Sequence, residues 1–326
     1  MRLLVPLILA IVLGSCGAAP EPPPAERAKS APPYAPGQRT LLHAHNCYPY
    51  HGEHADRIDR ALATGTPVVI EQDLIWNDGR SVVGHNCPCT GEEPTLEEYF
   101  FERVRPIVEQ ALADPKPEQW PLLILHLDLK TEEPEQLAAL SALLEKYKDW
   151  LTTAKRTETP EKQEPLHYGP VMVINEGSTV REKAFHDDVP VGGDIRIFGI
   201  LPPSDAPMTT EPAPQAMVAA GPNNYRRWWN LSWHAVEEGG QTKAGDWTPE
   251  DDARLRALVD YGHSQGVFVR FYCLNGHPAD DPHGWSPGYN FGSLEAVQQR
   301  WRAAKAAGVD WLATDQYEEL AKELSR

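Results

Sequence analysis

Short apolar runs alternate with amphipathic helical patterns along most of this 326-residue chain. A strand followed by a helix, repeated about eight times, predicts a parallel sheet closed into a single (β/α)8 TIM barrel. A doubly wound open sheet is the alternative, but no Gly-x-Gly-x-x-Gly motif follows the first strand. Strands are expected at residues 40–46, 67–74, 121–130, 170–175, 195–200, 225–233, 267–274 and 310–314, and helices at 54–64, 95–113, 134–149, 178–186, 248–265, 293–307 and 317–325.

The charge balance argues against one class of partner. The chain carries 47 acidic and 30 basic side chains, a formal net charge of −17. A nucleic-acid-binding protein would present a basic face, so no nucleic acid is expected as a partner. Hydrophobic residues make up 41% of the chain, which is enough for a large core.

The N-terminus has the pattern of an export signal. Arg2 precedes an apolar run at residues 3–13, and a run of this length is too short for a bilayer, which needs roughly 20 residues. The stretch Leu13-Gly14-Ser15-Cys16 resembles a bacterial lipobox, whose cysteine is lipidated and becomes the mature N-terminus. We therefore expect a lipoprotein signal peptide at 1–15 and a protein held by Cys16 on the cell membrane or outer membrane. A plain signal peptide with an incidental cysteine is the alternative.

A Pro-rich segment follows the signal. Residues 16–38 contain many prolines and almost no bulky apolar side chain, so they are interpreted as an extended tether before a barrel at 39–326. Outside the lipobox, the cysteines are Cys47, Cys87, Cys89 and Cys273. In an oxidising compartment these predict disulfides, with three pairings open, and no second Cys-x-x-Cys pair supports a metal site.

Ionisable residues occur at the carboxyl ends of the first three predicted strands. In the third strand, alternation places leucines on one face and His126, Asp128 and Lys130 on the other. Glu71 and Asp73 likewise share a face of the second strand. Barrel enzymes build their sites at this end. Hard carboxylate oxygens on Glu71, Asp73 and Asp128 suit one divalent cation, Mg²⁺ or Ca²⁺.

Histidines near this cluster are candidates for acid–base catalysis, because imidazole titrates near neutral pH. His43 and His45 share a face of the first strand, and His45 lies at its mouth. His85 follows the short apolar run Val82-Val83. We predict His45 and His85 as the catalytic pair and His126 as a deeper hydrogen-bonding residue. Lys130 either stabilises a phosphate charge or pairs with Asp128.

These residues together resemble the phospholipase C-like phosphodiesterase superfamily, which includes glycerophosphodiester phosphodiesterases, phosphatidylinositol-specific phospholipases C and sphingomyelinase D. The matching pieces lie in order between about residues 40 and 318, while 150–265 is nearly unmatched. They are His43-Ala44-His45-Asn46, Ile70-Glu71-Gln72-Asp73-Leu74, Asp78-Gly79 with Val82-Val83-Gly84-His85, Leu127-Asp128-Leu129-Lys130-Thr131 and Gly308-Val309-Asp310-Trp311-Leu312-Ala313-Thr314-Asp315.

The resemblance implies catalytic histidines at His45 and His85 and a divalent ion on Glu71, Asp73 and Asp128. The Cys87-Pro88-Cys89 loop is similar to a cysteine loop in sphingomyelinase D, and the placement of Glu53 before Glu71 is similar to that of a further metal glutamate. The chain also departs from the pattern. Glycerophosphodiesterases carry His-Arg-Gly, whereas Asn46 and Cys47 follow His45 here, and the His-Asn-x-Tyr start with Tyr48 is more like the phosphatidylinositol-specific relatives.

The sequence thus predicts a metal-dependent phosphodiester hydrolase acting on a small phosphodiester or a phospholipid. A non-catalytic cell-surface lipoprotein with a barrel binding module is one alternative. A glycosidase that uses two of the carboxylates as its acid and base is the other, although it leaves the histidines unexplained.

Overall fold

The computed structural model describes residues 34–49, 55–86, 89–114, 116, 119–237, 245–278, 280 and 287–326. The predicted signal peptide, Cys16, Glu53 and Cys87 lie outside these residues. No helix in the described ranges is both long and apolar enough to cross a membrane.

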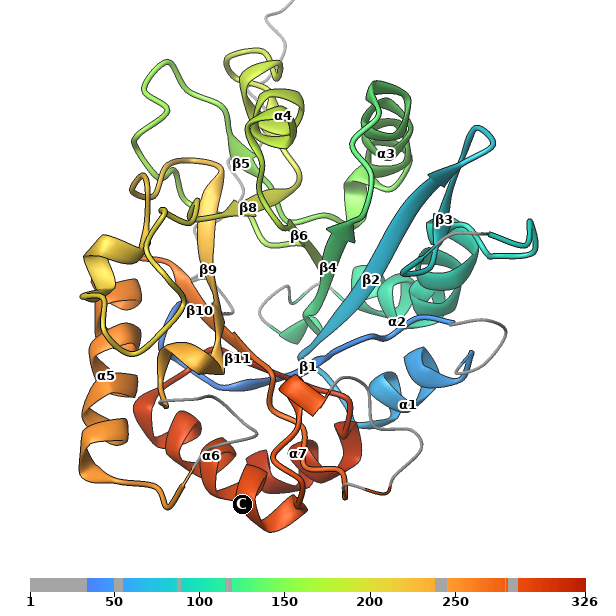
Figure 1. Cartoon of the computed structure of the whole chain (residues 1–326). Helices are drawn as coiled ribbons and strands as arrows, with labels where there is room; N and C mark the ends of the chain where they lie inside the picture. Colours follow the sequence, from blue (N-terminus) through green and yellow to red (C-terminus); the bar gives the residue numbers. More distant parts are fainter. Residues whose placement is uncertain are drawn as a thin grey trace, which may run out of the picture. The chain divides into compact units, whose positions relative to one another are not determined.

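Within the described ranges, eight parallel strands close into a barrel with helices around it, which confirms the predicted TIM barrel (Figure 1). β1 pairs with β2 on one side and with β11 on the other, so the sheet has no open edge there. The barrel strands are β1 (Leu41–Ala44), β2 (Val68–Asn77), β4 (Leu123–Leu129), β6 (Val171–Asn175), β8 (Phe198–Ile200), β9 (Arg226–Ser232), β10 (Phe268–Tyr272) and β11 (Trp311–Thr314).

The helices occupy the predicted segments, and local capping explains several of their ends. Thr248 and Asp251 form a reciprocal capping box at the start of α5, and Gly308 ends α6 in the left-handed conformation. The α-helices are α1 (Arg57–Ala63), α2 (Glu102–Ala113), α3 (Pro134–Lys146), α4 (Thr179–Glu182), α5 (Pro249–Ser264), α6 (Leu294–Ala307) and α7 (Tyr317–Leu324). Shorter elements are η1 (Glu97–Phe101), η3 (Lys148–Trp150), β5 (Ala154–Lys155), η4 (Lys183–Asp187), β7 (Asp194–Ile195), η5 (Pro214–Met217), η6 (Trp233–Ala235) and η7 (Pro287–Tyr289).

β2 continues beyond its predicted end into a hairpin that the sequence analysis missed. It runs to Asn77, turns at Asp78 and Gly79, and returns antiparallel as β3 (Arg80–Val83). Both turn residues have positive φ, 49° and 76°, as a type I′ turn requires. The hairpin matters because His85 lies directly after β3.

Side-chain alternation separates two apolar layers. The four leucines of β4 face outward against the helices, in the cluster that also holds Ile70, Val173 and Leu312. The lower interior of the barrel is filled by a second cluster, which includes Val69, Ile124, Trp228, Phe268 and Trp311. The barrel centre is therefore a packed core, and its upper end is left for polar side chains.

The segment 34–38 belongs to the predicted tether, but the structure places it against the lower barrel. Tyr34 is buried and stacks on Phe268 with ring centroids 4.9 Å apart. Its hydroxyl donates to the carbonyl oxygen of Arg39 at 3.0 Å. An aromatic residue that fills the barrel bottom cannot belong to an extended tether, so the packed unit begins before residue 39.

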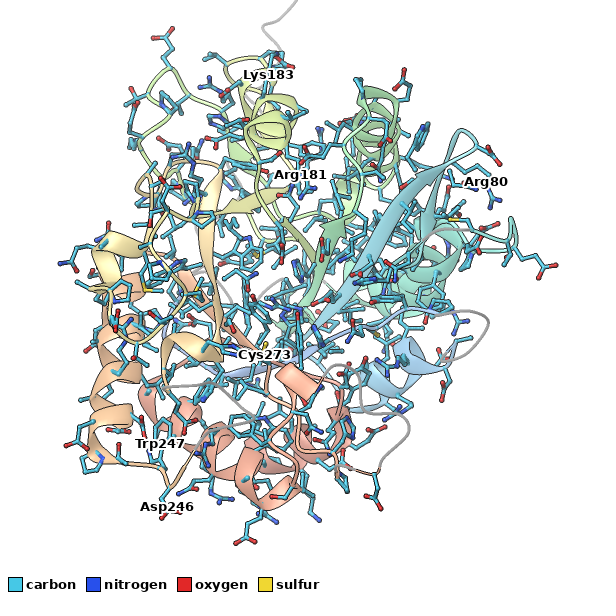
Figure 2. All side chains as sticks on the ribbon, in the orientation of Figure 1. Arg80, Arg181, Lys183, Asp246, Trp247 and Cys273 are labelled. Carbon is cyan, nitrogen blue, oxygen red and sulfur yellow. The ribbon has the colours of Figure 1, made fainter. Side chains whose placement is uncertain are left out.

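One described cysteine, Cys47, takes part in no disulfide. It is buried, and Cys273, which is labelled in Figure 2, is buried as well. Cys273 accepts a hydrogen bond from the Ser232 hydroxyl, with oxygen and sulfur 3.6 Å apart. The disulfide prediction is therefore wrong for Cys47, and for the other cysteines it stays a prediction.

Candidate functional site

The polar side chains at the upper end of the barrel surround one pocket of about 440 Å³. All of the residues that the sequence predicted as catalytic, metal-binding or phosphate-binding in the barrel line this pocket. They are His45, Glu71, Asp73, His85, Asp128 and Lys130. The pocket is also lined by Glu176, Asn230, Arg270, Asn46, Tyr48, Asn86, Tyr272 and Tyr289.

Strand register explains why the carboxylates meet. β2 and β4 run parallel, with Glu71 beside His126 and Asp73 beside Asp128. Residues two apart on a strand share a face, so Glu71 and Asp73 both project inward, one above the other. The hydrogen-bonding ladder therefore builds a polar wall from two neighbouring strands.

His45 lies between two carboxylates. Its Nε2 is 3.8 Å from Glu71 Oε1, and its Nδ1 is 3.4 Å from Asp315 Oδ1. Burial lowers the pKa of His45, but the negative charges of Glu71 and Asp315 outweigh burial and raise it above its usual value.

Asp315 contacts His45 at the candidate site, and the sequence analysis did not single it out. It follows β11 and is buried. Burial raises the pKa of Asp315, but His45 and Arg57 outweigh it, so the pKa is lowered and the side chain is a carboxylate. Arg57 Nη1 donates to Asp315 Oδ1 at 3.1 Å. The signal that could have found Asp315 is its place at the carboxyl end of the last barrel strand.

His85 approaches the pocket from the hairpin. Its Nε2 is 3.8 Å from Asp73 Oδ2, and the side chain is 42% exposed, in contrast to the largely buried His45. Its ring stacks on Tyr48 with centroids 6.4 Å apart and an interplanar angle of 23°. The two histidines therefore reach one pocket from different elements, and one of them is open to solvent.

Lys130 bridges two of the predicted metal ligands. Its Nζ lies 2.6 Å from Asp128 Oδ2 and 3.0 Å from Asp73 Oδ2. Burial lowers the pKa of Lys130, but the two aspartates outweigh burial and raise it, so the side chain is a cation. Burial and the charges of Glu71 and Asp128 raise the pKa of Asp73 well above its usual value. The pKa of Glu176 is raised as well, by burial and by Asp128.

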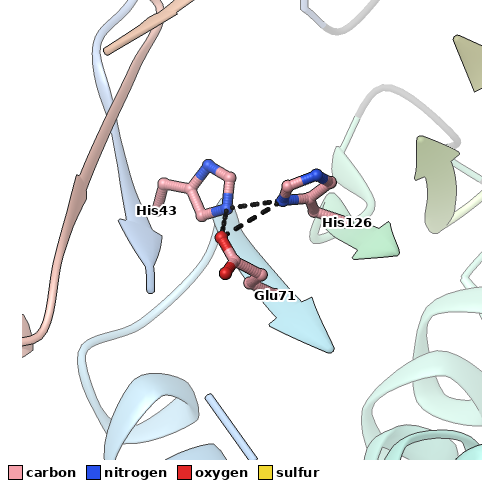
Figure 3. A group of neighbouring side chains, drawn as sticks. All are labelled: His43, Glu71 and His126. Atoms are coloured by element: carbon pink, nitrogen blue, oxygen red, sulfur yellow. Dashed lines mark hydrogen bonds and ion pairs between the residues drawn. The ribbon is translucent and has the colours of Figure 1, made fainter. Parts of the chain in front are cut away.

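One layer deeper, His43, Glu71 and His126 form a tight triangle (Figure 3). His43 Nε2 and His126 Nδ1 lie 3.2 and 3.3 Å from Glu71 Oε2, and 3.1 Å from one another. By distance these three atoms could share a metal ion. His126 is fully buried and hydrogen-bonded, as expected.

Arg270 determines what the triangle can bind. Its Nη2 donates to Glu71 Oε2 at 2.6 Å, and its Nε donates to His43 Nδ1 at 2.9 Å. An arginine N–H is always a donor, so His43 Nδ1 must accept and the proton of the neutral ring lies on Nε2. His43 Nε2 then has no lone pair for a metal. The triangle is a hydrogen-bonded base that holds Glu71.

Comparison with known proteins identifies distant similarity only. No protein-family profile matches the chain, and no curated protein matches it by sequence. Among solved structures, a glycerophosphodiester phosphodiesterase from Parabacteroides distasonis is 15% identical with a TM-score of 0.45, over 88% of this chain and 97% of that chain. A phosphatidylinositol-specific phospholipase C from Listeria monocytogenes is 14% identical with a TM-score of 0.45, over 90% and 96%.

Both proteins belong to branches of the superfamily that the sequence motifs resemble. A third similar structure, Plasmodium falciparum HPPK-DHPS with a pterin, is 9% identical with a TM-score of 0.44, over 89% of this chain and 48% of that chain. At these identities and TM-scores the similarities carry no conclusion about activity, because one barrel fold hosts many reactions.

Proposed function

We propose that this chain is a phosphodiester hydrolase in which His45 and His85 form the acid–base pair. One observation carries the proposal: two histidines on different elements line one pocket together with Glu71, Asp73 and Lys130. A pair of imidazoles beside a cationic side chain matches what phosphodiester cleavage requires. One group takes the proton of the attacking hydroxyl, and the other protonates the leaving oxygen.

The charge of the pocket supports a divalent cation as part of the site. Among the described residues, the pocket is lined by four carboxylates against the cations Lys130 and Arg270. The pKa of Asp73 is raised by burial and by the charges of Glu71 and Asp128, so these crowded carboxyl groups lack a compensating positive charge. The fit is also local: Asp73 Oδ1 is buried and has no hydrogen-bond partner. Such an oxygen is the hard ligand that Mg²⁺ or Ca²⁺ prefers.

We assign that ion to Glu71, Asp73 and Asp128. When bound, it would withdraw charge from the phosphoryl oxygens and stabilise the developing oxyanion. The other roles fall to the chain's own residues. Lys130 offers a cation to the phosphate, and Asp315 and Glu71 hold the His45 ring from both sides. The attacking group is water or a neighbouring hydroxyl of the substrate, and both use the same pair of histidines.

The alternatives fit the pocket less well. A glycosidase would need two carboxyl groups facing each other across a sugar cleft, whereas Asp73 and Asp128 are neighbours in register that share Lys130. A binding module without catalysis does not account for a histidine between Glu71 and Asp315, where its pKa is raised.

For the cell, we propose an exported protein anchored by a lipid on Cys16. The proposal rests on the lipobox-like Leu13-Gly14-Ser15-Cys16 and on the Pro-rich segment after it. The substrate would then be a small phosphodiester or a phospholipid met outside the cytoplasm.

The test is hydrolysis of bis(4-nitrophenyl) phosphate by the full chain with Mg²⁺ or Ca²⁺, and by His45→Ala and His85→Ala variants. Each substitution should lower kcat by about 10²–10⁴-fold, because each removes one proton-transfer group. His167→Ala is the matched control, since His167 is exposed and does not line the pocket. Hydrolysis that survives both substitutions at the wild-type rate would refute the proposal.

A further inference from the structure

A short turn after β1 touches both candidate catalytic histidines. Asn46 and Tyr48 are buried, at 8% and 1% exposure, although they belong to a loop. Asn46 has a φ of 50°, the left-handed conformation that non-glycine residues seldom adopt. The Tyr48 backbone N–H donates to the Asn46 carbonyl at 2.9 Å, so the turn is tight. Buried residues in rare backbone conformations are typical of functional sites.

Both the NH₂ group and the oxygen of the Asn46 amide make contacts beside His45. Its Nδ2 lies 2.8 Å from His45 Nδ1 and donates to Asp315 Oδ1 at 3.0 Å. Its Oδ1 accepts a hydrogen bond of 2.8 Å from the Tyr48 hydroxyl. The Asp315 carboxylate can only accept, so it determines that the NH₂ group points toward His45 and Asp315 and that Oδ1 points toward Tyr48. The Tyr48 hydroxyl holds the Oδ1 end of the amide in that orientation.

The ring of Tyr48 serves the other histidine. It stacks on His85 at 6.4 Å between centroids and lies nearly parallel to it. His85 is partly open to solvent and follows a hairpin, so this stacking limits where its ring can turn. A tyrosine hydroxyl is a donor at neutral pH, as the contact with Asn46 Oδ1 requires.

The turn itself is held from three sides. Arg57 of α1 donates to the Asn46 carbonyl at 2.9 Å, and the Tyr317 hydroxyl of α7 donates to the His45 carbonyl at 2.5 Å. Gln72 of β2 donates to the Cys47 carbonyl. Helices and strand thus hold the backbone, so the side chains of the turn have a defined direction.

We propose that Tyr48 is a positioning residue for both histidines, acting on His45 through the Asn46 amide and on His85 through its ring. The inference rests on the proposed function, which assigns the two histidines to catalysis, and extends it with a common support for the pair. Tyr48 takes no part in proton transfer to substrate in this scheme.

Two substitutions separate the two contacts. Tyr48→Phe removes the hydroxyl and keeps the ring, so it should disturb His45 alone. Tyr48→Leu removes both and should disturb His85 as well. Tyr225→Phe is the matched control, because the Tyr225 hydroxyl is also buried and donates to an asparagine, Asn175 Oδ1 at 2.8 Å, away from the pocket.

The first measurement does not depend on activity. Imidazole ¹⁵N NMR spectra of the full chain are assigned with the His45→Ala and His85→Ala variants. Tyr48→Phe and Asn46→Ala should each shift the His45 nitrogens, and Tyr48→Leu should also shift those of His85. Tyr225→Phe should leave both unchanged. Spectra in which Tyr48→Phe leaves the His45 nitrogens at their wild-type positions would overturn the proposal.

The second measurement uses two phosphodiesters, one with a nitrophenolate and one with an alkoxide leaving group. Loss of the general acid slows the alkoxide substrate more, so the histidine variants show which ring donates the proton. Tyr48→Phe should lower kcat about tenfold with little change in KM. The ratio of its losses on the two substrates should equal the ratio for His45→Ala. Tyr48→Leu should show a further loss, divided between the two substrates as it is for His85→Ala. A leaving-group preference of Tyr48→Phe that differs from that of His45→Ala would mean a packing role only.

The two proposals fail in different ways. If His45→Ala hydrolyses as fast as wild type while the NMR shifts appear as expected, the proposed function is wrong and the positioning contacts stand. If both histidine variants lose activity and Tyr48→Phe matches Tyr225→Phe in spectra and rates, the positioning role is wrong and the proposed function stands.

Discussion

At the scale of single residues, the candidate catalytic residues and metal ligands were easier to predict from the sequence than the charged residues that contact them. His45 and Asp128 stand out in the sequence because polar residues at strand ends are rare within apolar runs. Asp315 and Arg270 were missed because each is one charged residue with no patterned neighbour. Their importance comes from contacts over more than two hundred residues of chain, such as Arg270 with His43.

At this scale we predict the effect of Asp315→Asn. The substitution keeps the shape but removes one of the charges that raise the pKa of His45. The pH limb of kcat/KM that reports His45 should therefore move to lower pH. The rate should fall about 10-fold or more, because the ring loses its oriented partner. A pH–rate profile checks this, and thermal unfolding serves as the control for folding. An unchanged limb would mean that Asp315 does not act on His45.

At the scale of elements, the alternation of strands and helices could be predicted because each period has a distinct apolar pattern. The hairpin of β2 and β3 was missed since its turn is only Asp78-Gly79 and its second strand is short. The inner face of β10 was missed for another reason. Phe268, Arg270 and Tyr272 alternate inward on a strand that the sequence identified correctly, but a lone arginine gives no sign of the carboxylate it will meet.

Arg270 yields a prediction about the stability of the barrel. Arg270→Met removes the cation that pairs with the buried Glu71 carboxylate, whose Oε2 lies 2.6 Å from Arg270 Nη2. This should lower the free energy of unfolding by about 3–5 kcal/mol at pH 7. Arg270 is among the groups that hold the pKa of Glu71 well below its usual value. Without it, burial favours the protonated acid. The deficit should therefore shrink as the pH falls toward about 4, where the carboxyl becomes neutral.

Urea unfolding in the presence of a chelator, at pH 7 and near pH 4, measures both quantities. The double variant Arg270→Met with Glu71→Gln should recover part of the stability, because no unpaired charge remains. A deficit that does not change with pH would show that Arg270 supports the barrel by packing and not by its charge.

At the scale of the whole molecule, the barrel follows from the order of its elements, and closure follows from the pairing of β1 with both β2 and β11. The site could be predicted to this extent because parallel strands end at one face of the barrel.

Ion binding depends on side chains from more than one strand at this face of the barrel. A divalent cation that binds only the folded chain should stabilise it by about 2.7 kcal/mol at a hundredfold excess over Kd, which raises Tm by roughly 5 °C in a domain of this size.

Thermal unfolding with Mg²⁺, Ca²⁺ or chelator measures that shift. Asp128→Asn should abolish it, because the substitution removes a ligand. Asp149→Asn should retain it, since Asp149 is exposed on η3 and lies outside the pocket. The same Tm with and without both ions would contradict the assigned metal site.

The last prediction concerns where the molecule is held. Residues 3–13 form an apolar run, Cys16 ends a lipobox-like stretch, and prolines recur from there to Pro36. If Cys16 carries the lipid, the wild-type full chain should sediment with membranes and incorporate labelled fatty acid, since acyl chains bind a bilayer through their buried methylene groups. Cys16→Ser should leave the label unincorporated and the protein in the soluble or unprocessed fraction. Cys89→Ser is the matched control and should behave as wild type. Label retained in Cys16→Ser, or absent from wild type, would contradict the lipid anchor and leave the barrel chemistry untouched.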